Sequence, residues 1–190
     1  MTIIFNKFVN VNGLFRMTSL LVACGLLLSL MFFVAVRGIA ALQFDYAYLA
    51  KNMQLQKRLA HMESSLSLYD NDPAALEYTG TLYMDFAVNQ NFMVRITFWR
   101  KALALFRKAL RIRPVSPYTW GNLALVKLYL WEYDAELTQA FDNISAYGPW
   151  TQDIHLLLVK NGLKVWNLLD TPTQNSLDAL RIRLYRMEVQ

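Results

Sequence analysis

Residues 17–36 read MTSLLVACGLLLSLMFFVAV, twenty consecutive residues without a charge, and lie between Arg16 and Arg37. At a rise of about 1.5 Å per residue, a helix of this length covers roughly 30 Å, the thickness of the hydrocarbon core of a bilayer. Lipid offers the backbone no hydrogen-bond partner, so such a segment is stable there only as a helix. The segment therefore predicts one membrane-spanning helix, with the rest of the chain tethered to it.

Two other interpretations of this segment are less favourable. A cleavable secretory signal has an apolar core of about 7–15 residues before a small-residue cleavage site. Here the core is longer, and Arg37 separates it from the small residues Gly38 and Ala40. A buried helix of a soluble protein normally keeps a polar face, which this segment lacks. We therefore expect residues 1–37 to be an N-terminal tail and an uncleaved anchor.

The positive-inside rule does not settle the orientation, because basic residues flank the span on both sides. They are Lys7 and Arg16 before it, and Arg37, Lys51, Lys57 and Arg58 after it. A short basic N-terminus before a single anchor typically stays in the bacterial cytoplasm. We accordingly expect a single-pass protein of the bacterial inner membrane with a periplasmic body. Its expected partners are the lipid bilayer and other membrane or periplasmic proteins of a complex.

Composition favours helices over sheets in this body. About 150 of the 190 residues follow the anchor, enough for one compact domain. The chain has only 7 glycines and 5 prolines, and no long stretch alternates apolar and polar residues. The single cysteine, Cys24, lies within the apolar segment, which excludes an intramolecular disulfide and a cysteine metal cluster.

Residues 38–71 are expected to form a helical stalk that continues from the membrane. Apolar side chains follow a heptad spacing at Ile39, Leu42, Tyr46, Leu49 and Met53, and in a shifted register at Leu55, Leu59, Met62, Leu66 and Tyr69. Either the stalk packs on the domain, or the seam pairs two copies of the chain. The small residues Gly25 and Ser29 of the anchor are also compatible with pairing of two membrane helices.

Helix boundaries recur through residues 72–190. Asp72 is a candidate N-cap with Pro73 in the first turn, and the segment Pro114-Val115-Ser116-Pro117 ends one helix and begins the next, with Ser116 able to cap it. Gly148-Pro149 is expected to do the same, with Gly148 as a left-handed terminator. Thr171-Pro172 marks a last helix. The spacing of 35 residues between Pro114 and Pro149 is close to the 34-residue period of tetratricopeptide repeats.

Individual residues match the contact positions of these repeats, which need small side chains where helices touch and bulky ones between them. The matches are Leu76, Gly80, Tyr83, Ala102, Phe106, Ala109 and Pro114 in a first unit, and Trp120, Leu123, Ala124, Phe141 and Pro149 in a second. Residues 88–97 form an extension or insertion in the first unit, and Leu137 and Ile144 replace expected alanines in the second.

Residues 151–169 give a third, partial unit. A C-terminal helix over residues 173–188 would cap the stack with an apolar stripe of Leu177, Leu180, Leu184 and Met187. The expected fold is all-α, with a single N-terminal transmembrane helix followed by a short tetratricopeptide-like α-solenoid. An unrelated helical bundle is the alternative.

Charge is polarised along this body. Residues 86–131 contain eight basic residues and no acid, whereas residues 132–178 contain seven acids and two lysines. Basic residues of one helix share a face: Arg100, Arg107 and Arg111, with Lys101 and Lys108 beside them. Such a face could bind lipid phosphates, an anionic glycan or an acidic partner, although a merely solvated face is the plainer interpretation. Nucleic acid is not an expected partner, because no recognised binding motif occurs in the sequence.

Other candidate sites have similarly plain interpretations. Glu132, Asp134 and Glu136 gather at an expected turn, where a solvated acidic patch is the ordinary explanation. Exposed aromatic rings can stack on sugars, but most aromatic residues here have the spacing of helix packing. Trp131 and Trp150 lie near expected helix ends and are the expected exposed rings.

Enzymatic activity is not expected. His61 and His155 are far apart in the sequence, and neither has a metal-ligand partner at helical spacing. No glycine-rich phosphate loop, nucleophile elbow or zinc spacing occurs in the sequence. We therefore expect no catalytic residue, no cofactor and no metal.

A pattern of prolines, aromatic residues and a lysine in residues 111–169 carries a resemblance: Pro114, Pro117, Tyr118, Trp120, Leu123, Ala124, Lys127, Gly148, Pro149, Trp150 and Trp166. With the single anchor, this pattern resembles the VpsP-family polysaccharide biosynthesis proteins of bacterial exopolysaccharide gene clusters. Thr151-Gln152 departs from the acidic-proline pair expected after Gly-Pro-Trp. The resemblance implies a non-catalytic, membrane-anchored adaptor or scaffold that is accessory to exopolysaccharide biosynthesis or export.

Two alternatives stay open at this point. One is an assembly factor or accessory subunit of another membrane protein complex. The other is a binder of anionic glycans or lipid head groups that uses the basic helix face and exposed aromatic rings.

Overall fold

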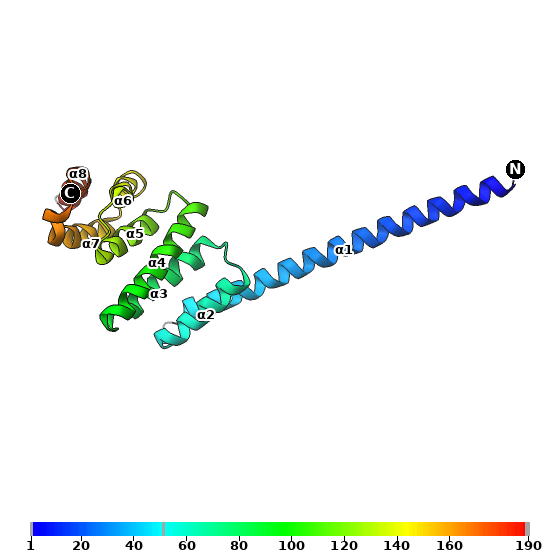
Figure 1. The fold of residues 1–190 in the computed structure, drawn as a ribbon, viewed down its shortest axis with the longest axis horizontal. Helices are drawn as coiled ribbons and strands as arrows, with labels where there is room; N and C mark the ends of the chain where they lie inside the picture. Colours follow the sequence, from blue (N-terminus) through cyan, green and yellow to red (C-terminus); the bar gives the residue numbers. More distant parts are fainter. Residues whose placement is uncertain (1, 51, 189–190) are drawn as a thin grey trace.

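The protein is described by a computed structural model that covers residues 2–50 and 52–188, with side chains described for residues 16–50 and 52–186. Within these residues the chain forms helices joined by short turns, and no strand (Figure 1). The helices are α1 (Thr2–Leu49), α2 (Leu55–Leu68), α3 (Pro73–Val88), α4 (Phe92–Ile112), α5 (Pro117–Leu130), α6 (Ala135–Tyr147), α7 (Gln152–Gly162), the short 3₁₀ helix η1 (Leu163–Leu168) and α8 (Thr171–Glu188). The fold is all-α, as expected.

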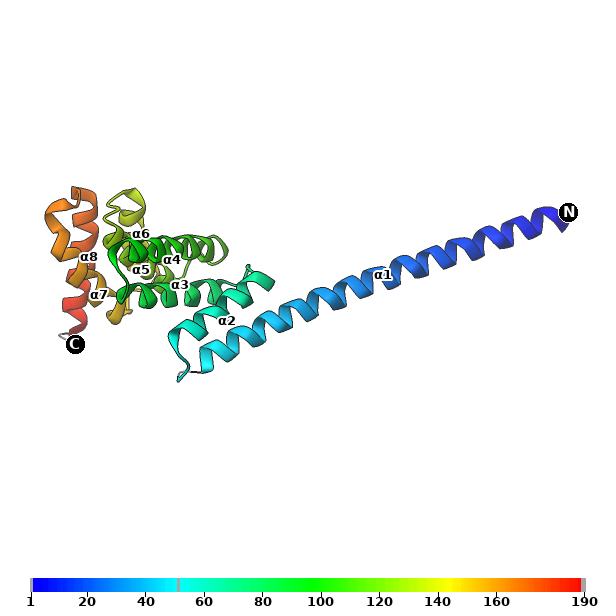
Figure 2. The same cartoon turned by 60° about the horizontal axis from the view of Figure 1, so that its bottom comes forward.

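The N-terminal helix is a long rod that projects from a compact helical body (Figures 1 and 2). The 34-residue part Arg16–Leu49 is long and apolar enough to cross a membrane. Its side chains from Arg16 to Ala35 are exposed, and Cys24 is among them. Gly25 and Ser29 lie on this exposed rod, and a methyl group added at Gly25 would meet no neighbour within 4 Å.

The expected continuous stalk is instead a helical hairpin, which corrects the sequence-based prediction. Helix α1 ends at Leu49, and α2 runs back beside it. Three contacts show the antiparallel direction: Ser65 Oγ donates to Ala40 O (2.8 Å), His61 Nδ1 lies 2.7 Å from Gln43 Oε1, and Arg58 Nε donates to Ala47 O (3.3 Å).

The two arms of this hairpin meet through small side chains of α1. Ala40 and Ala47 are buried, and Leu59 and Met62 of α2 are buried with them. Alanine lets the two helix backbones approach closely, which a leucine would prevent. The first apolar seam therefore does not form this contact: Ile39, Leu42, Tyr46 and Leu49 are all at least half exposed.

Three further antiparallel helix pairs form the body: α3 with α4, α5 with α6, and α7 with α8. Their boundaries largely follow the expected signals. Asp72 caps α3 by accepting a hydrogen bond from the amide of Ala74 (2.9 Å), with Pro73 as the first helical residue, and Ser116 caps α5. Helix α8 begins at Thr171.

Two details of these boundaries differ from expectation. Gly148 ends α6 with a φ of −131°, so it is not a left-handed terminator. It allows close packing instead, because a Cβ there would lie 2.4 Å from Pro117 Cβ. Among the described residues, the left-handed backbone is found at Trp131, which ends α5 with a φ of 56°. The expected insertion at residues 88–97 comprises the last residue of α3, a short turn and the first turns of the 21-residue α4.

The core runs without interruption from the α1–α2 hairpin to α8. Most residues expected at helix contacts are buried: Leu76, Gly80, Tyr83, Ala102, Phe106, Ala109, Leu123, Ala124 and Phe141. The ring of Phe106 lies over Gly80, where an added Cβ would come within 2.5 Å of it. Leu177, Leu180 and Leu184 bury the apolar stripe of α8, while the side chain of Met187 lies outside the described residues.

Candidate functional site

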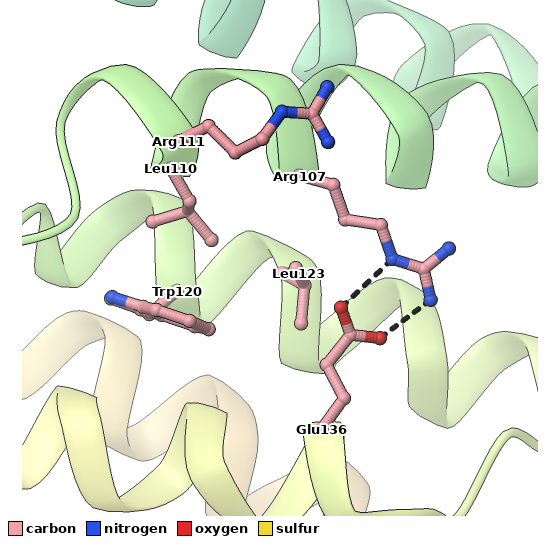
Figure 3. Close-up of a pocket in the computed structure, with 6 residues that line it drawn as sticks. All are labelled: Arg107, Leu110, Arg111, Trp120, Leu123 and Glu136. Carbon is pink, nitrogen blue, oxygen red and sulfur yellow. Dashed lines mark hydrogen bonds and ion pairs between the residues drawn. The ribbon is translucent and has the colours of Figure 1, made fainter.

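A surface groove of about 300 Å³ lies where α4, α5 and α6 meet (Figure 3). Six residues line it: Arg107, Leu110, Arg111, Trp120, Leu123 and Glu136. We call this cavity the α4–α6 groove. It combines an apolar floor with two guanidinium groups and one carboxylate, so it is suited to a ligand with both apolar and acidic parts.

The helices place these side chains by simple periodicity. Arg107 and Arg111 are one turn apart on α4, and so project from the same side of it (Figure 3). Leu110 and Leu123 are buried and form the floor. The indole of Trp120 donates from Nε1 to the carbonyl of Pro114 (2.7 Å), which fixes the ring along one wall.

Arg107 and Glu136 close one end of the groove with a bidentate ion pair. Arg107 donates from Nε to Oε1 (2.9 Å) and from Nη2 to Oε2 (2.6 Å). The Arg107 bonds and, less strongly, Lys127 lower the pKa of Glu136 from 4.5 to about 2, against the opposing effect of burial. The same pair raises the pKa of Arg107. Glu136 is therefore a carboxylate at any physiological pH, and Arg107 already has its counter-charge.

Beneath this pair lies a fully buried lysine. Lys127 Nζ lies 2.7 Å from Glu136 Oε2, 2.8 Å from Asp134 Oδ2 and 3.6 Å from Glu132 Oε2. The three acids expected to form a solvated patch instead surround this ammonium, which corrects that prediction. A buried ammonium is stable only with such partners, because its desolvation is costly. We refer to Lys127, Glu132, Asp134 and Glu136 as the Lys127 cluster.

The five residues expected to form the basic face are not equally free to bind a ligand, because some of them already have partners within the protein. Arg107 is held by Glu136 and Lys108 by Asp70. The Lys101 ammonium lies over the rings of Phe98 and Tyr83, at 5.1 and 5.4 Å from their centroids.

The other two members are Arg100 and Arg111. Both are exposed and make no ion pair or hydrogen bond within the described part of the chain. Of these two, Arg111 lines the groove.

The two expected exposed tryptophans are indeed exposed, Trp131 by 58 % and Trp150 by 78 %. They do not form one platform, because Trp131 follows α5 and Trp150 follows the antiparallel α6, at the opposite end of that helix pair. Trp131 also packs against Phe92, with ring centroids 6.0 Å apart.

The two histidines lie in different environments. His61 contacts Gln43 in the α1–α2 hairpin. His155 is fully buried without a hydrogen-bond partner on either ring nitrogen, and burial, with a smaller effect of Arg183, lowers its pKa. Among the described residues, no group of three histidine, cysteine, aspartate or glutamate side chains is arranged to hold a metal ion.

A second cavity, of about 290 Å³, was missed by sequence reasoning. Phe44 and Tyr48 of α1 stack at 5.6 Å, and Tyr78 of α3 packs edgewise on both. Glu77 and Arg113 form an ion pair of 2.7 Å at its margin. No short-range signal marks this cavity, since its residues come from three separate segments.

The sequence matches no protein-family model, and a search of curated proteins likewise gives no match.

Proposed function

We propose that this protein is a membrane-anchored, non-catalytic adaptor in which α1 spans the bilayer and the α4–α6 groove binds an acidic segment of a partner protein. The observation that carries the proposal is the state of Arg111. It is exposed at an apolar groove and has no ion pair among the described residues, whereas the neighbouring Arg107 already has Glu136 as its counter-charge. An arriving carboxylate can therefore pair with Arg111 without displacing an existing bond.

The apolar floor adds a second requirement. Leu110, Leu123 and the Trp120 ring offer contact area to an aliphatic or aromatic side chain next to the acid. The Lys127 cluster holds Glu136 in place and so keeps the end of the groove rigid. A pre-organised groove of this kind loses little conformational entropy on binding.

Its helix pairs support a tetratricopeptide-like α-solenoid, a repeat architecture that binds peptides and protein surfaces. Consecutive helices pack in antiparallel pairs, and Phe106 lies over Gly80 as that repeat requires. Helix α8 packs on α6 and α7 and buries Leu177 and Leu180, as a capping helix would.

The proposed setting is the bacterial inner membrane, with the body in the periplasm and a role accessory to exopolysaccharide biosynthesis or export. It rests on the resemblance to the VpsP-family proteins. Three residues that carry the resemblance lie at or beside the groove: Trp120 and Leu123 line it, and Lys127 binds Glu136.

The test compares two charge reversals on one helix, Arg111→Glu and Arg100→Glu. Both arginines are exposed and have no ion pair in the part of the chain that the structure describes, but only Arg111 is among the groove-lining residues. We expect affinity purification of the full chain from native membranes to recover a partner protein with Arg100→Glu and to lose it with Arg111→Glu. Equal recovery with both variants, equal loss with both, or recovery of the chain alone would contradict the proposal.

Two further readouts address the setting. If an anionic glycan co-purifies in place of a protein and is lost with Arg111→Glu, the protein is a glycan binder and not an adaptor. A reporter fused after residue 190, active only outside the cytoplasm, should be active if the body is periplasmic. An inactive reporter in an intact, membrane-bound fusion would reverse the orientation.

A further inference from the structure

One face of α1 beyond the apolar span is at least half exposed in the described part of the chain. Ile39, Leu42, Tyr46 and Leu49 are exposed by 50, 70, 57 and 72 %. Their spacing of 3, 4 and 3 residues places them in one stripe along the helix. We call these four residues the α1 stripe. Large apolar side chains exposed together in this way mark an interaction surface.

The rest of the molecule leaves most of this stripe clear, although the Tyr46 ring packs edgewise on His61 of α2, with ring centroids 5.0 Å apart. The side of α1 that carries Ala40 and Ala47 is covered by α2, and the side that carries Phe44 and Tyr48 faces Tyr78 of α3. At about 100° per residue, the stripe lies roughly opposite Phe44 and Tyr48 on the helix. A partner helix can therefore lie along the exposed side of the stripe without displacing α2 or the body, and at Tyr46 it would pack beside the ring that contacts His61.

The bilayer does not cover the whole stripe, if α1 spans it as proposed above. Leu49 lies 13 residues after Val36, the last residue of the charge-free segment, or about 20 Å along the helix axis. The head-group layer adds only roughly 5–8 Å on each side of the hydrocarbon core. Tyr46 and Leu49 therefore stand in water unless a protein covers them.

We propose that a second copy of this chain covers the α1 stripe, in a parallel homodimer. Two copies anchored by the same span hold each residue at the same height above the bilayer. A parallel pairing then places every stripe residue opposite its own counterpart, in the heptad register that a left-handed two-helix supercoil requires. Another protein would need an independently matched spacing to fit.

Charge and the membrane segment agree with this pairing. The stripe itself carries no charge, and the guanidinium of Arg37 lies over the Tyr69 ring, 4.5 Å from its centroid, on the side of the α1–α2 hairpin. Gly25 precedes Ile39 by two heptads and so continues the line of the stripe into the apolar span. Its lack of a side chain allows two helices to approach closely there.

Disulfide cross-linking of the full chain in native membranes tests the proposal. In a Cys24→Ser background, single cysteines replace Leu42 and Leu49 on the stripe, and Ala41 serves as an exposed control on another side of α1. We expect mild oxidation to give a covalent dimer with Leu42→Cys and Leu49→Cys, several-fold more than with Ala41→Cys. Equal dimer yields at all three positions, no dimer at the stripe positions, or cross-linking to a different protein would each overturn the proposal.

A second variant separates this inference from the proposed function on which it rests. Leu42→Glu combined with Leu49→Glu should abolish the dimer, detected with a cysteine at Tyr46, while the protein stays in the carbonate-resistant membrane fraction. An undiminished dimer would overturn the pairing. If the unaltered chain is also lost from the carbonate-resistant membrane fraction, α1 does not anchor the protein in the membrane. The adaptor function is tested separately, by partner recovery with the Arg111 variant.

Discussion

Replacing Lys127 with methionine keeps the apolar stem of a fully buried side chain and removes its ammonium group. That ammonium lies within 2.8 Å of both Glu136 and Asp134, and 3.6 Å from Glu132. Without it, three carboxylates of like charge gather around a methyl group, and only Glu136 keeps a cation, Arg107. We therefore expect Lys127→Met to lower the free energy of unfolding of the body.

The magnitude follows from how much water reaches the acids. Removing one partner of a fully buried ion pair typically costs about 3–5 kcal/mol. Here the side chains of Glu136, Glu132 and Asp134 are exposed by 30, 36 and 54 %, so water solvates part of the charge that Lys127 leaves behind. We accordingly expect a loss of about 2 kcal/mol, below the range for a fully buried pair.

Urea unfolding of the full chain in detergent micelles, followed by tryptophan fluorescence, measures this loss. All 5 tryptophans lie between residues 99 and 166, so the signal reports on the body and not on α1 or α2. The matched control is Lys160→Met, because Lys160 is exposed on α7 and has no ion pair among the described residues. The control should change the free energy of unfolding by less than about 0.5 kcal/mol.

A double-mutant cycle with Glu136→Gln sharpens the comparison. If Lys127 and Glu136 interact as the structure shows, the two changes together should cost clearly less than the sum of the separate changes. Two results would refute the reasoning. One is a Lys127→Met effect no larger than that of Lys160→Met, and the other is strict additivity with Glu136→Gln.

Three more predictions use the same unfolding assay. The pKa of Glu136 is lowered in the folded protein, so its contribution to the free energy of unfolding is present above pH 4.5 and is lost as the pH falls towards 2. Allowing for solvent screening, Glu136→Gln should remove about 1–2 kcal/mol of this acid dependence. An unchanged pH profile would contradict the prediction. Burial lowers the pKa of His155, so the unfolded chain binds more protons, and stability should begin to fall below about pH 6.5; His155→Leu should abolish that slope. Gly121→Ala should cost about 1–3 kcal/mol, because its Cβ would lie 2.2 Å from Ile154 Cγ1, whereas Gly38→Ala, with nothing within 4 Å, should leave unfolding of the body unchanged.

Helix boundaries were the most predictable part of the fold, because each depends on a local side chain. Asp72 caps α3 and Ser116 caps α5, since their side-chain oxygens accept hydrogen bonds from free backbone amides a few residues ahead. The apolar pattern likewise predicted the long N-terminal helix. Gly148 shows the limit of this reasoning, because whether a glycine supplies a left-handed turn or merely space depends on what packs against it.

The direction of α2 could not be predicted from periodicity. Apolar spacing indicated that Ile39 and Leu42 share a face, but it does not say which face of a helix meets the next one. The contact instead uses Ala40 and Ala47, whose small size allows close approach but gives little signal in the sequence. No proline or glycine marks the turn between α1 and α2.

The candidate site was predictable only in part. A basic face on α4 was expected, but which arginines stay free depends on acids from other helices. Glu136 binds Arg107, whereas Arg111 has no acidic partner among the residues with described side chains. Lys127 resembled a surface lysine because its burial depends on three acids in the following turn and helix. A lysine near the end of one helix, followed by closely spaced acids at the start of the next, is the signal that could have indicated the cluster.

The α1–α2 hairpin also determines how this protein responds to mechanical load. The anchor and the body leave the hairpin at the same end, where Arg37 of α1 meets Tyr69 after α2. A pull between membrane and body therefore peels the arms apart and does not slide them past each other. We expect the contacts to break from that end, in the order Arg37–Tyr69, Ala40–Ser65, Gln43 and Tyr46 with His61, and Ala47–Arg58. Because the load then falls on one turn of the hairpin at a time, we expect the arms to open at a lower force than sliding them past each other would need, and each opened turn lengthens the tether.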